Sequence, residues 1–263
     1  MNNLLLIDGH SILNRAFYGI PMLTNHEGIH TNAIYGFINI MLRAMEDEKS
    51  DHIAVAFDLK APTFRHKMYE MYKGTRKPMP AELHEQVPVI KEILASMNIP
   101  VITLEGYEAD DILGTVGKKA QSLGYNVVIL SGDRDLLQLA DEHIKIRLPK
   151  TIKGRTEIEN YYPEDVMEKY MATPSEFIDL KALMGDSSDN IPGVPGIGEK
   201  TAMSIISKYH SIENAYEHVE ELTPAKAKNS LRENYDLAKL SKVLATIETD
   251  APVEFNIEDS AIG

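Results

Sequence analysis

Short apolar runs alternate with segments of helical periodicity along the first half of the chain. The runs cover residues 4–7, 53–57, 101–104 and 127–130, and most of their side chains are branched and aliphatic. Between the third and fourth runs, apolar side chains recur at helical spacing from Ile112 to Leu123, and Gly124 ends the pattern. Strands that alternate with helices in this way predict an α/β fold with a parallel sheet.

The second half of the chain is predicted to be mainly helical. Residues 144–172 read as a crossover region with a strand at 144–148, a turn at 153–154 and a helix at 163–170. Thr173, Pro174 and Glu176 then form a capping box with proline at the first helical position, which predicts a helix start. We therefore divide the chain into a core at 1–172, a helical region at 173–250 and an acidic tail or linker at 251–263.

Carboxylates follow every one of the four predicted strands. Since the carboxyl ends of parallel strands share one edge of a sheet, we expect these acids to meet there. A single Asp at a strand end is an ordinary turn or cap residue, but four converging groups are hard to explain in that way. The acids concerned are Asp8, Asp58, Glu108, Asp110, Asp111, Asp133 and Asp135.

A cluster of this kind needs counterions. Two like charges about 4 Å apart repel by roughly 4 kcal/mol at an effective dielectric constant of ~20. Bound cations or protons would relieve that repulsion. A ligand set that offers only oxygen, with no His or Cys, favours Mg²⁺ or Mn²⁺. The pattern therefore predicts a divalent metal site at this edge.

Residues 59–82 form a basic segment directly after Asp58. From Lys60 to Lys77, six Lys or Arg residues accompany one acid, Glu70, and aromatic side chains such as Tyr72 are interleaved with them. A charged run is usually a solvated loop or helix face. Its position next to the acids favours a mobile clamp on a polyanion, with rings that can stack on bases. A further helix is predicted at 83–98.

A glycine-rich hairpin separates two predicted helices near residues 190–201. Gly196 and Gly198 would let a phosphate approach backbone N–H groups, and the helix that starts near Glu199 presents its positive end there. This arrangement predicts a reader of the nucleic-acid backbone. Asp186 and Asp189 precede the hairpin and read equally well as plain loop residues or as site residues.

The net charge and composition of the chain are compatible with these predictions. The formal net charge of −13 argues mildly against nucleic-acid binding, but much of it belongs to the candidate metal ligands. The absence of Cys excludes disulfides and thiolate sites. No membrane-spanning stretch and no secretory leader is visible, so we expect a cytoplasmic, nucleoid-associated protein.

Several strings together resemble the 5′-nuclease (flap endonuclease) family over residues 2–250. They are Leu6-Ile7-Asp8-Gly9 with Arg15-Ala16-Phe17, Val55-Ala56-Phe57-Asp58, residues 106–111, residues 131–135, and residues 184–201. The last string is nearly diagnostic, whereas each of the others alone is weak. Phe17 departs from the tyrosine that some members carry, which affects only a stacking detail.

The resemblance implies a mostly parallel sheet with helices on both faces (a PIN-like 5′-nuclease fold). It also implies a helical arch at 59–98 and a helix-hairpin-helix element, called helix-3-turn-helix, that binds duplex DNA and often K⁺. The implied activity is 5′-3′ exonuclease and 5′-flap endonuclease cleavage of DNA with two or more Mg²⁺ ions, for which Mn²⁺ can substitute. The implied partner is branched or nicked duplex DNA with a 5′ end or flap, bound by a monomer in replication and repair, with a polymerase domain in the same polypeptide as a candidate neighbour.

The family's acids map onto nine positions of this chain. Asp8, Asp58, Glu108 and Asp110 would form most of one metal site. Asp133, Asp135 and Asp186 would form most of the other, while Asp111 and Asp189 support through water. Lys73 and Arg76 would stabilise the reacting phosphate. The expected DNA contacts are Arg15, Arg65, Tyr72, Lys73, Arg76, Gly196, Gly198, Lys200 and Thr201.

Two other functions stay open at this stage. One is a non-catalytic module that binds duplex DNA with the same fold, which the intact carboxylates disfavour. The other is a metal-dependent ribonuclease of the related small α/β type. The hairpin at 190–201 disfavours it, because such an enzyme does not need a grip on duplex DNA.

Overall fold

A six-stranded sheet forms the centre of the computed structural model, which describes all residues 1–263. The strand order is β3-β2-β1-β4-β5-β6, and only β6 runs antiparallel to its neighbour. The strands are β1 (Asn3–Asp8), β2 (His52–Ala56), β3 (Val101–Ile102), β4 (Asn126–Leu130), β5 (Ile144–Ile152) and β6 (Arg155–Tyr161). The predicted α/β fold is thus confirmed, although β3 is shorter than the apolar run at 101–104 because Leu104 accepts a hydrogen bond from Tyr107 in a turn.

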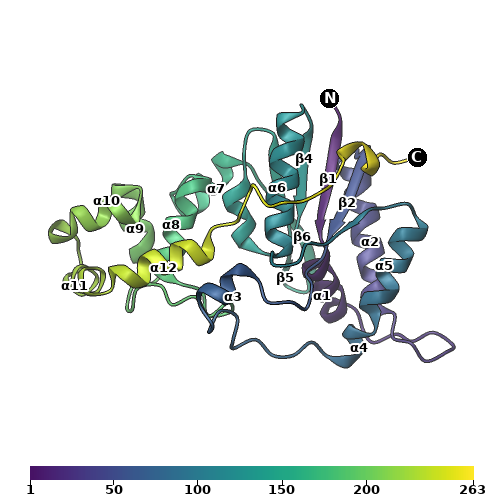
Figure 1. Cartoon of the computed structure of the whole chain (residues 1–263), viewed down its shortest axis with the longest axis horizontal. Helices are drawn as coiled ribbons and strands as arrows, with labels where there is room; N and C mark the ends of the chain where they lie inside the picture. Colours follow the sequence, from purple (N-terminus) through teal and green to yellow (C-terminus); the bar gives the residue numbers. More distant parts are fainter.

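Helices cover both faces of the sheet, as the period of its side chains requires. Leu4 and Leu6 of β1 pack on one side, whereas Leu5 and Ile7 pack on the other. The first side faces α6 (Ala109–Ser122), and its core continues into the helical region. The second side faces α1 (Gly9–Gly19), α2 (Asn32–Asp47) and α5 (Gln86–Ser96) (Figure 1).

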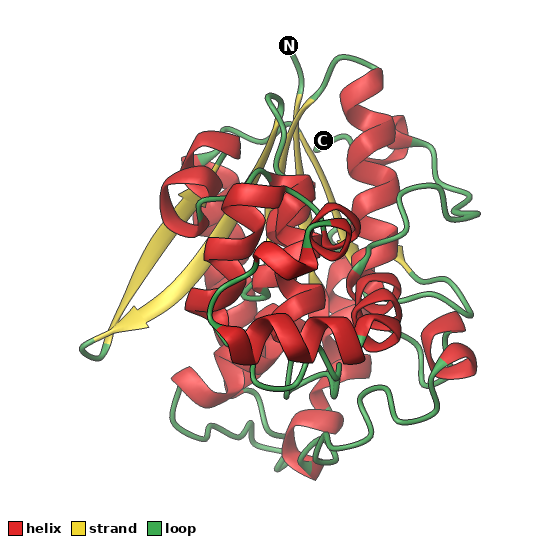
Figure 2. Ribbon diagram, turned by 90° about the vertical axis from the view of Figure 1, so that its left-hand side faces the viewer, coloured by secondary structure: helices red, strands yellow, loops and turns green.

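The hairpin of β5 and β6 extends out past the helices at the edge of the sheet (Figure 2). It leads to α7 (Pro163–Tyr170), as expected. The helical region then follows with α8 (Pro174–Met184), α9 (Glu199–Tyr209), α10 (Ile212–Glu217), the 3₁₀ turn η2 (Val219–Glu221), α11 (Ala225–Glu233) and α12 (Tyr235–Ala245). The capping box at the start of α8 is formed, because the Thr173 hydroxyl accepts from Glu176 N at 3.2 Å and the Glu176 carboxylate accepts from Thr173 N at 2.9 Å.

Two glycines allow the backbone to cross itself between α8 and α9. Gly185 and Gly193 have φ of +70° and +61°, and a Cβ on Gly193 would lie 2.4 Å from the Gly185 nitrogen. Between them, Asp186 and Ile191 form an antiparallel bridge. The crossing closes the loop 186–191 into a tight unit from which the glycine-rich hairpin continues.

The basic segment is only partly helical. It contains α3 (Phe64–Met68) and, after an irregular stretch, α4 (Ala81–His84), which adjoins α5 at Glu85. The irregular stretch lies against the loop 186–191, where Lys73 N donates to Asp189 O at 2.7 Å and the Asn190 amide donates to Met71 O at 2.7 Å. The segment is therefore docked on the helical region.

Residues 251–263, expected to be an acidic tail or linker, pack against the rest of the chain. The chain leaves α12, passes along α6 and forms the 3₁₀ turn η3 (Ile257–Ser260) beside β2 (Figure 1). Ala251, Ile257 and Ser260 are buried there, and Ile262 N donates to Asp51 O at 2.8 Å. None of the helices combines the length and the apolar character needed to cross a bilayer.

The backbone crossing gives a stability prediction. Replacement of Gly193 by Ala should lower the free energy of unfolding by about 2 kcal/mol or more, since it adds both a positive-φ strain and a backbone clash. Gly198→Ala is the matched control, because Gly198 has open space around its Cα and an ordinary φ of −89°, and it should stay within about 0.5 kcal/mol of the parent. Urea unfolding of the two variants measures the difference, and equal stabilities would contradict it.

Candidate active site

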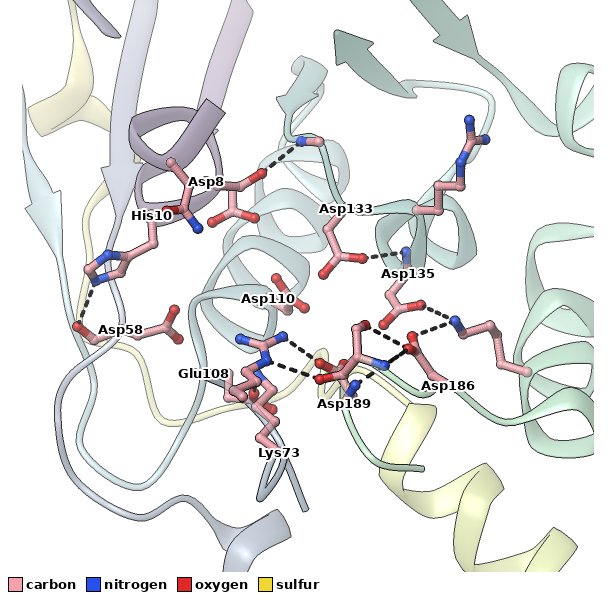
Figure 3. A pocket seen from close by; sticks show the side chains of 17 residues that line it. Asp8, His10, Asp58, Lys73, Glu108, Asp110, Asp133, Asp135, Asp186 and Asp189 are labelled. Atoms are coloured by element: carbon pink, nitrogen blue, oxygen red, sulfur yellow. Dashed lines mark hydrogen bonds and ion pairs between the residues drawn. The ribbon is translucent and has the colours of Figure 1, made fainter. Parts of the chain in front are cut away.

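A polar cavity of about 460 Å³ lies at the carboxyl edge of the parallel strands. Seventeen residues line it, and none of them is hydrophobic (Figure 3). Eight of the nine predicted ligands are among them: Asp8, Asp58, Glu108, Asp110, Asp133, Asp135, Asp186 and Asp189. The topology explains this gathering, because the strands deliver their ends to one edge and the loop 186–191 reaches the same place from α8.

Asp8 occupies the end of the central strand. It is buried, and the Ser131 hydroxyl donates to its Oδ2 at 2.8 Å. Burial, followed by the negative charges of Asp58 and Asp133, raises the pKa of Asp8 to about 7 despite that hydrogen bond. A carboxyl with this environment is ready to bind a cation in place of its proton.

Asp110 and Asp133 face each other across the cavity (Figure 3). Burial raises the pKa of Asp110 well above its ordinary range, and the charges of Asp133 and Asp8 act in the same direction. The pKa of Asp133 is also raised, mainly by burial, although Asp135 N donates to its Oδ1 at 2.9 Å. That hydrogen bond caps the 3₁₀ turn η1 (Arg134–Leu139) and fixes the carboxylate toward the cavity.

Asp135, Asp186 and Asp189 form a second group. One oxygen from each lies within 4.8 Å of the other two, a separation that a shared cation could bridge. Burial and the neighbouring Asp133 raise the pKa of Asp135 to about 7. Lys181 of α8 lies between two of the acids, 3.1 Å from Asp135 and 2.7 Å from Asp186, and its charge helps to hold the pKa of Asp186 below its ordinary value in spite of burial.

Glu108 is the acid with the most positive surroundings. Lys73 and Arg65 form ion pairs with its two oxygens, and the Tyr72 hydroxyl donates to both at 3.1 Å. Burial alone would raise its pKa, but the two cations outweigh that cost and keep the pKa below the ordinary value. Glu108 is therefore ionised, and it also caps the first turn of α6.

Asp111 differs from the expectation, because its carboxylate points away from the cavity. It is fully buried, and it accepts from Glu108 N at 2.9 Å, from Glu248 N at 2.9 Å and from both terminal nitrogens of Arg65 at 2.9 and 2.8 Å. These donors satisfy its oxygens. Asp111 is placed to hold the start of α6 rather than to support a metal ion.

Two of the expected DNA contacts are also buried. Arg65 is 2% exposed and Tyr72 is 4% exposed, and both are turned toward Glu108. Lys73 and Arg76, by contrast, line the cavity, and Arg76 pairs with Asp189. The burial of Arg65 is at odds with the expected contact to DNA, while the contacts expected of Lys73 and Arg76 stay predictions.

The remaining predicted DNA contacts lie outside the cavity. Gly198 is the N-cap of α9, with Lys200 and Thr201 in the first turn and Gly196 in the hairpin before it. Arg15 of α1 donates to Thr151 at 3.1 Å, next to the turn of the β5–β6 hairpin. None of these residues lines the cavity.

Lys181 and His10 are among the cavity residues that sequence reasoning missed. Lys181 stands on a helix that is buried on nearly all sides, so no amphipathic pattern marked it. His10 follows the strand end of Asp8 by two residues, and its Nε2 lies 3.4 Å from the Asp58 carbonyl. Its position directly after Asp8-Gly9 was the one available signal, and burial lowers its pKa despite the charge of Asp58.

The donor set fits hard divalent cations. It consists of carboxylate oxygens, without thiols, and several of these carboxyls hold raised pKa values because their charges are close together and buried. Cations at this position would remove the unfavourable charge that the fold has concentrated there. Asp8, Asp110 and Glu108 can serve one site, and Asp135, Asp186 and Asp189 another.

Family models match both parts of the chain. Residues 3–171 match the 5′-3′ exonuclease, N-terminal resolvase-like domain, and residues 172–263 match the 5′-3′ exonuclease, C-terminal SAM fold. The chain belongs to the 5′-3′ exonuclease family. The resemblance seen in the sequence is thereby confirmed, and the acidic cavity lies in the N-terminal of the two matched domains, with Lys181, Asp186 and Asp189 contributed by the other.

Curated relatives refine the assignment. The chain is 50% identical over 254 residues to DNA polymerase I of Bacillus subtilis and 49% identical over 258 residues to DNA polymerase I of Bacillus caldotenax. These matches cover 97% and 98% of this chain, respectively, but only 29% of each relative. The chain therefore spans less than a third of the length of these relatives.

Solved structures share the fold at low sequence identity. T5 5′-exonuclease with bound zinc is 24% identical with a TM-score of 0.76, over 94% of this chain and 90% of that one. The T5 D15 flap endonuclease in a pseudo-enzyme-product complex with DNA and metal ions is 23% identical with a TM-score of 0.75, over 95% and 90%. The catalytic core of Rad2 with DNA substrate is more distant, at 14% identity and a TM-score of 0.59 over 97% and 83%.

The raised pKa values predict a pH dependence of stability in the metal-free protein. Asp8 and Asp135 titrate near 7 when folded and near ~3.9 when unfolded, so the folded state binds more protons between these values. Their contribution is therefore fully present below about pH 4 and is lost as the pH rises through about 7. In EDTA, Asp135→Asn should flatten the fall in unfolding free energy between about pH 5 and pH 8.

Asp141→Asn serves as the control for that measurement. Asp141 pairs with Lys118 at 2.8 Å, and this hydrogen bond holds its pKa below the ordinary value despite partial burial. Its removal should leave the slope in this pH range unchanged. Urea unfolding at four pH values gives the slope of unfolding free energy against pH for each protein. Identical slopes for the parent and Asp135→Asn would refute the raised pKa of Asp135.

Proposed function

We propose that the protein is a structure-specific 5′ nuclease, a 5′-3′ exonuclease and 5′-flap endonuclease that hydrolyses DNA phosphodiester bonds with two Mg²⁺ ions. The observation that carries the proposal is the cavity in which eight carboxylates from five separate segments converge. The names of the T5 5′-exonuclease and flap endonuclease structures, which carry metal ions and DNA, support it. Mn²⁺ should replace Mg²⁺, since both prefer oxygen ligands.

The carboxylates would divide into two ligand sets. Asp8, Glu108 and Asp110, with Asp58 at the rim, would hold one ion, while Asp133, Asp135 and Asp186, assisted by Asp189, would hold the other. Bound at these positions, divalent ions supply a water of lowered pKa and stabilise charge on the attacked phosphate and the leaving oxygen. The fixed positions of Asp8 and Asp133, held by Ser131 and by the backbone of Asp135, orient these sets.

Lys73 and Arg76 would stabilise the phosphate that reacts. Each already lies at the cavity and pairs with a carboxylate, Lys73 with Glu108 and Arg76 with Asp189. A bound phosphate would attract the side chains of Lys73 and Arg76, and bound metal ions would attract the carboxylates of Glu108 and Asp189. Substrate and metal together would therefore replace these two ion pairs. The buried Tyr72 would stack on a base only if it left its contact with Glu108.

The 5′ strand would pass through a larger neighbouring cavity. This cavity of about 1020 Å³ lies between the basic segment and the core, and Lys60, Lys77 and Lys91 line it together with His84. It shares His10, Asp58 and Arg76 with the acidic cavity. A single strand is narrow enough to enter this cavity, and its phosphates would be attracted by the lysines. A duplex is wider and would stay outside.

The duplex would lie on the hairpin before α9. Gly196, Gly198, Lys200 and Thr201 present exposed or half-buried backbone and side-chain donors at the positive end of that helix. K⁺ bound at the hairpin would add to this grip, and Arg15 would contact the strand on the other side of the cavity. Backbone contacts carry little sequence information, so selectivity should depend on DNA structure.

The cellular role follows from the relatives. Because the chain spans under a third of the length of the DNA polymerase I relatives, a polymerase domain in the same polypeptide is part of this proposal. The protein would act as a monomer in the bacterial cytoplasm at the nucleoid, on nicked or flapped duplex produced during primer removal and repair. A non-catalytic module or a small ribonuclease fits less well, since eight of the nine predicted ligands line one cavity and the hairpin before α9 is present.

Cleavage of a 5′-labelled flap tests the activity. With Mg²⁺ the parent should release short products that bear a 5′ phosphate, and EDTA should abolish the reaction. Asp133→Asn should lower kcat by about 10³-fold or more, since it removes a ligand at the reacting charge, and should leave DNA affinity in Ca²⁺ within about threefold. A variant as active as the parent would refute the proposed metal site.

Substitution of Lys200 tests the duplex contact. Lys200→Gln should weaken DNA binding several-fold and reduce the slope of log affinity against log salt by about one, as expected for one lost phosphate contact. Lys208→Gln on the last turn of the same helix is the matched control, because Lys208 is exposed and lies over the Tyr209 ring. Fluorescence anisotropy over a range of KCl concentrations provides both numbers. Equal slopes for the two variants would exclude the proposed duplex path.

A further inference from the structure

Arg65 is a buried cation whose donors are all engaged. Its Nε donates to Leu244 O at 3.0 Å, and its Nη2 donates to Asp111 at 2.8 Å and to Thr246 O at 2.6 Å. Its Nη1 donates to Asp111 at 2.9 Å and pairs with Glu108. A buried guanidinium with a complete set of partners has a single well-defined position.

Arg65 and its partners belong to three parts of the fold. Arg65 itself stands on α3 of the basic segment, Asp111 and Glu108 belong to the start of α6, and Leu244 and Thr246 lie at the end of α12 (Figure 1). The end of α12 is fixed in turn, because Ser241 accepts a hydrogen bond from Gly193 N at 2.8 Å. The guanidinium is therefore anchored on rigid elements outside the cavity.

Only one of its partners is a residue of the cavity. Arg65 pairs with Oε2 of Glu108, whereas Lys73 pairs with Oε1. Lys73 is partly exposed and lies at the cavity, so it can move to a phosphate, but Arg65 cannot leave its anchors. Oε2 would then stay bound to Arg65 while Oε1 is turned into the cavity.

We propose that Arg65 is a positioning residue of the metal site, which holds Oε2 of Glu108 so that Oε1 is presented to a divalent ion. The proposal rests on the function proposed above. Lysine cannot replace arginine in this role, because an ammonium group has three donors at one point and cannot reach two carboxylates and two carbonyls in a plane. Arg65 touches neither DNA nor metal in this account and acts through Glu108.

Arg65→Lys tests the proposal, with Arg43→Lys as the matched control on the exposed face of α2. Manganese affinity without DNA is measured by calorimetry, and kcat and KM are measured on a 5′-flap substrate. Arg65→Lys should weaken manganese binding by about tenfold and lower kcat by about 10- to 100-fold, as is typical when the group that orients a metal ligand is lost. KM should change by less than about threefold, because the DNA contacts are untouched.

Glu108→Gln separates positioning from a general loss of structure. If Arg65 acts through Glu108, Arg65→Lys should lower kcat by less than about threefold in the Glu108→Gln background, since coupled residues are not additive. An undiminished effect in that background would overturn the proposal. The proposal would also be overturned if Arg65→Lys lowered the thermal unfolding temperature in EDTA but kept the manganese affinity and kcat of the parent.

Asp111→Asn carries the test if Arg65→Lys does not fold. It keeps the shape of the side chain but weakens the anchor of Arg65, so it should reproduce the loss of manganese affinity and kcat to a smaller degree. Parental values for folded Asp111→Asn would overturn the proposal. Lack of flap cleavage by the parent would instead refute the proposed function, and the manganese measurements would still report on Arg65.

Discussion

Repulsion among like charges is the constraint on which the rest of this structure depends. Eight carboxylates surround one cavity of about 460 Å³, and each close pair costs roughly 4 kcal/mol at ~4 Å and an effective dielectric constant of ~20. Protons, Lys73, Arg76 and Lys181 offset part of this cost. A fold that keeps such a cluster together must hold each acid by its surroundings, because the acids themselves push one another apart.

The groups that hold the acids in place are themselves uncharged or fully paired. Ser131 holds Asp8, the backbone of Asp135 holds Asp133, and the Arg65–Asp111 pair holds the start of α6. Each of these groups sits on a strand end or a helix start that is packed in one of the two cores. Rigid elements thus hold the acids in place against their mutual repulsion.

The sequence predicted the strand-end acids because topology alone brings them together, whatever the packing details. It could not separate Asp110 from Asp111, since neighbours on a helix point about 100° apart and only the tertiary contacts decide which one faces the cavity. The partners that bury Arg65 lie about 180 residues further along the chain, at Leu244 and Thr246. Likewise, residues 251–263 have no hydrophobic periodicity from which their packing against β2 could have been predicted.

The loop 186–191 connects what would otherwise be three independent functions. It carries Asp186 and Asp189, accepts the Lys73 N–H on Asp189 O at 2.7 Å, and continues directly into the hairpin before α9. Gly185 and Gly193 bring its two ends into close contact. Acids of the cavity, a docking point of the basic segment and the start of the hairpin are therefore all held by one short piece of backbone, so the position of each depends on that loop.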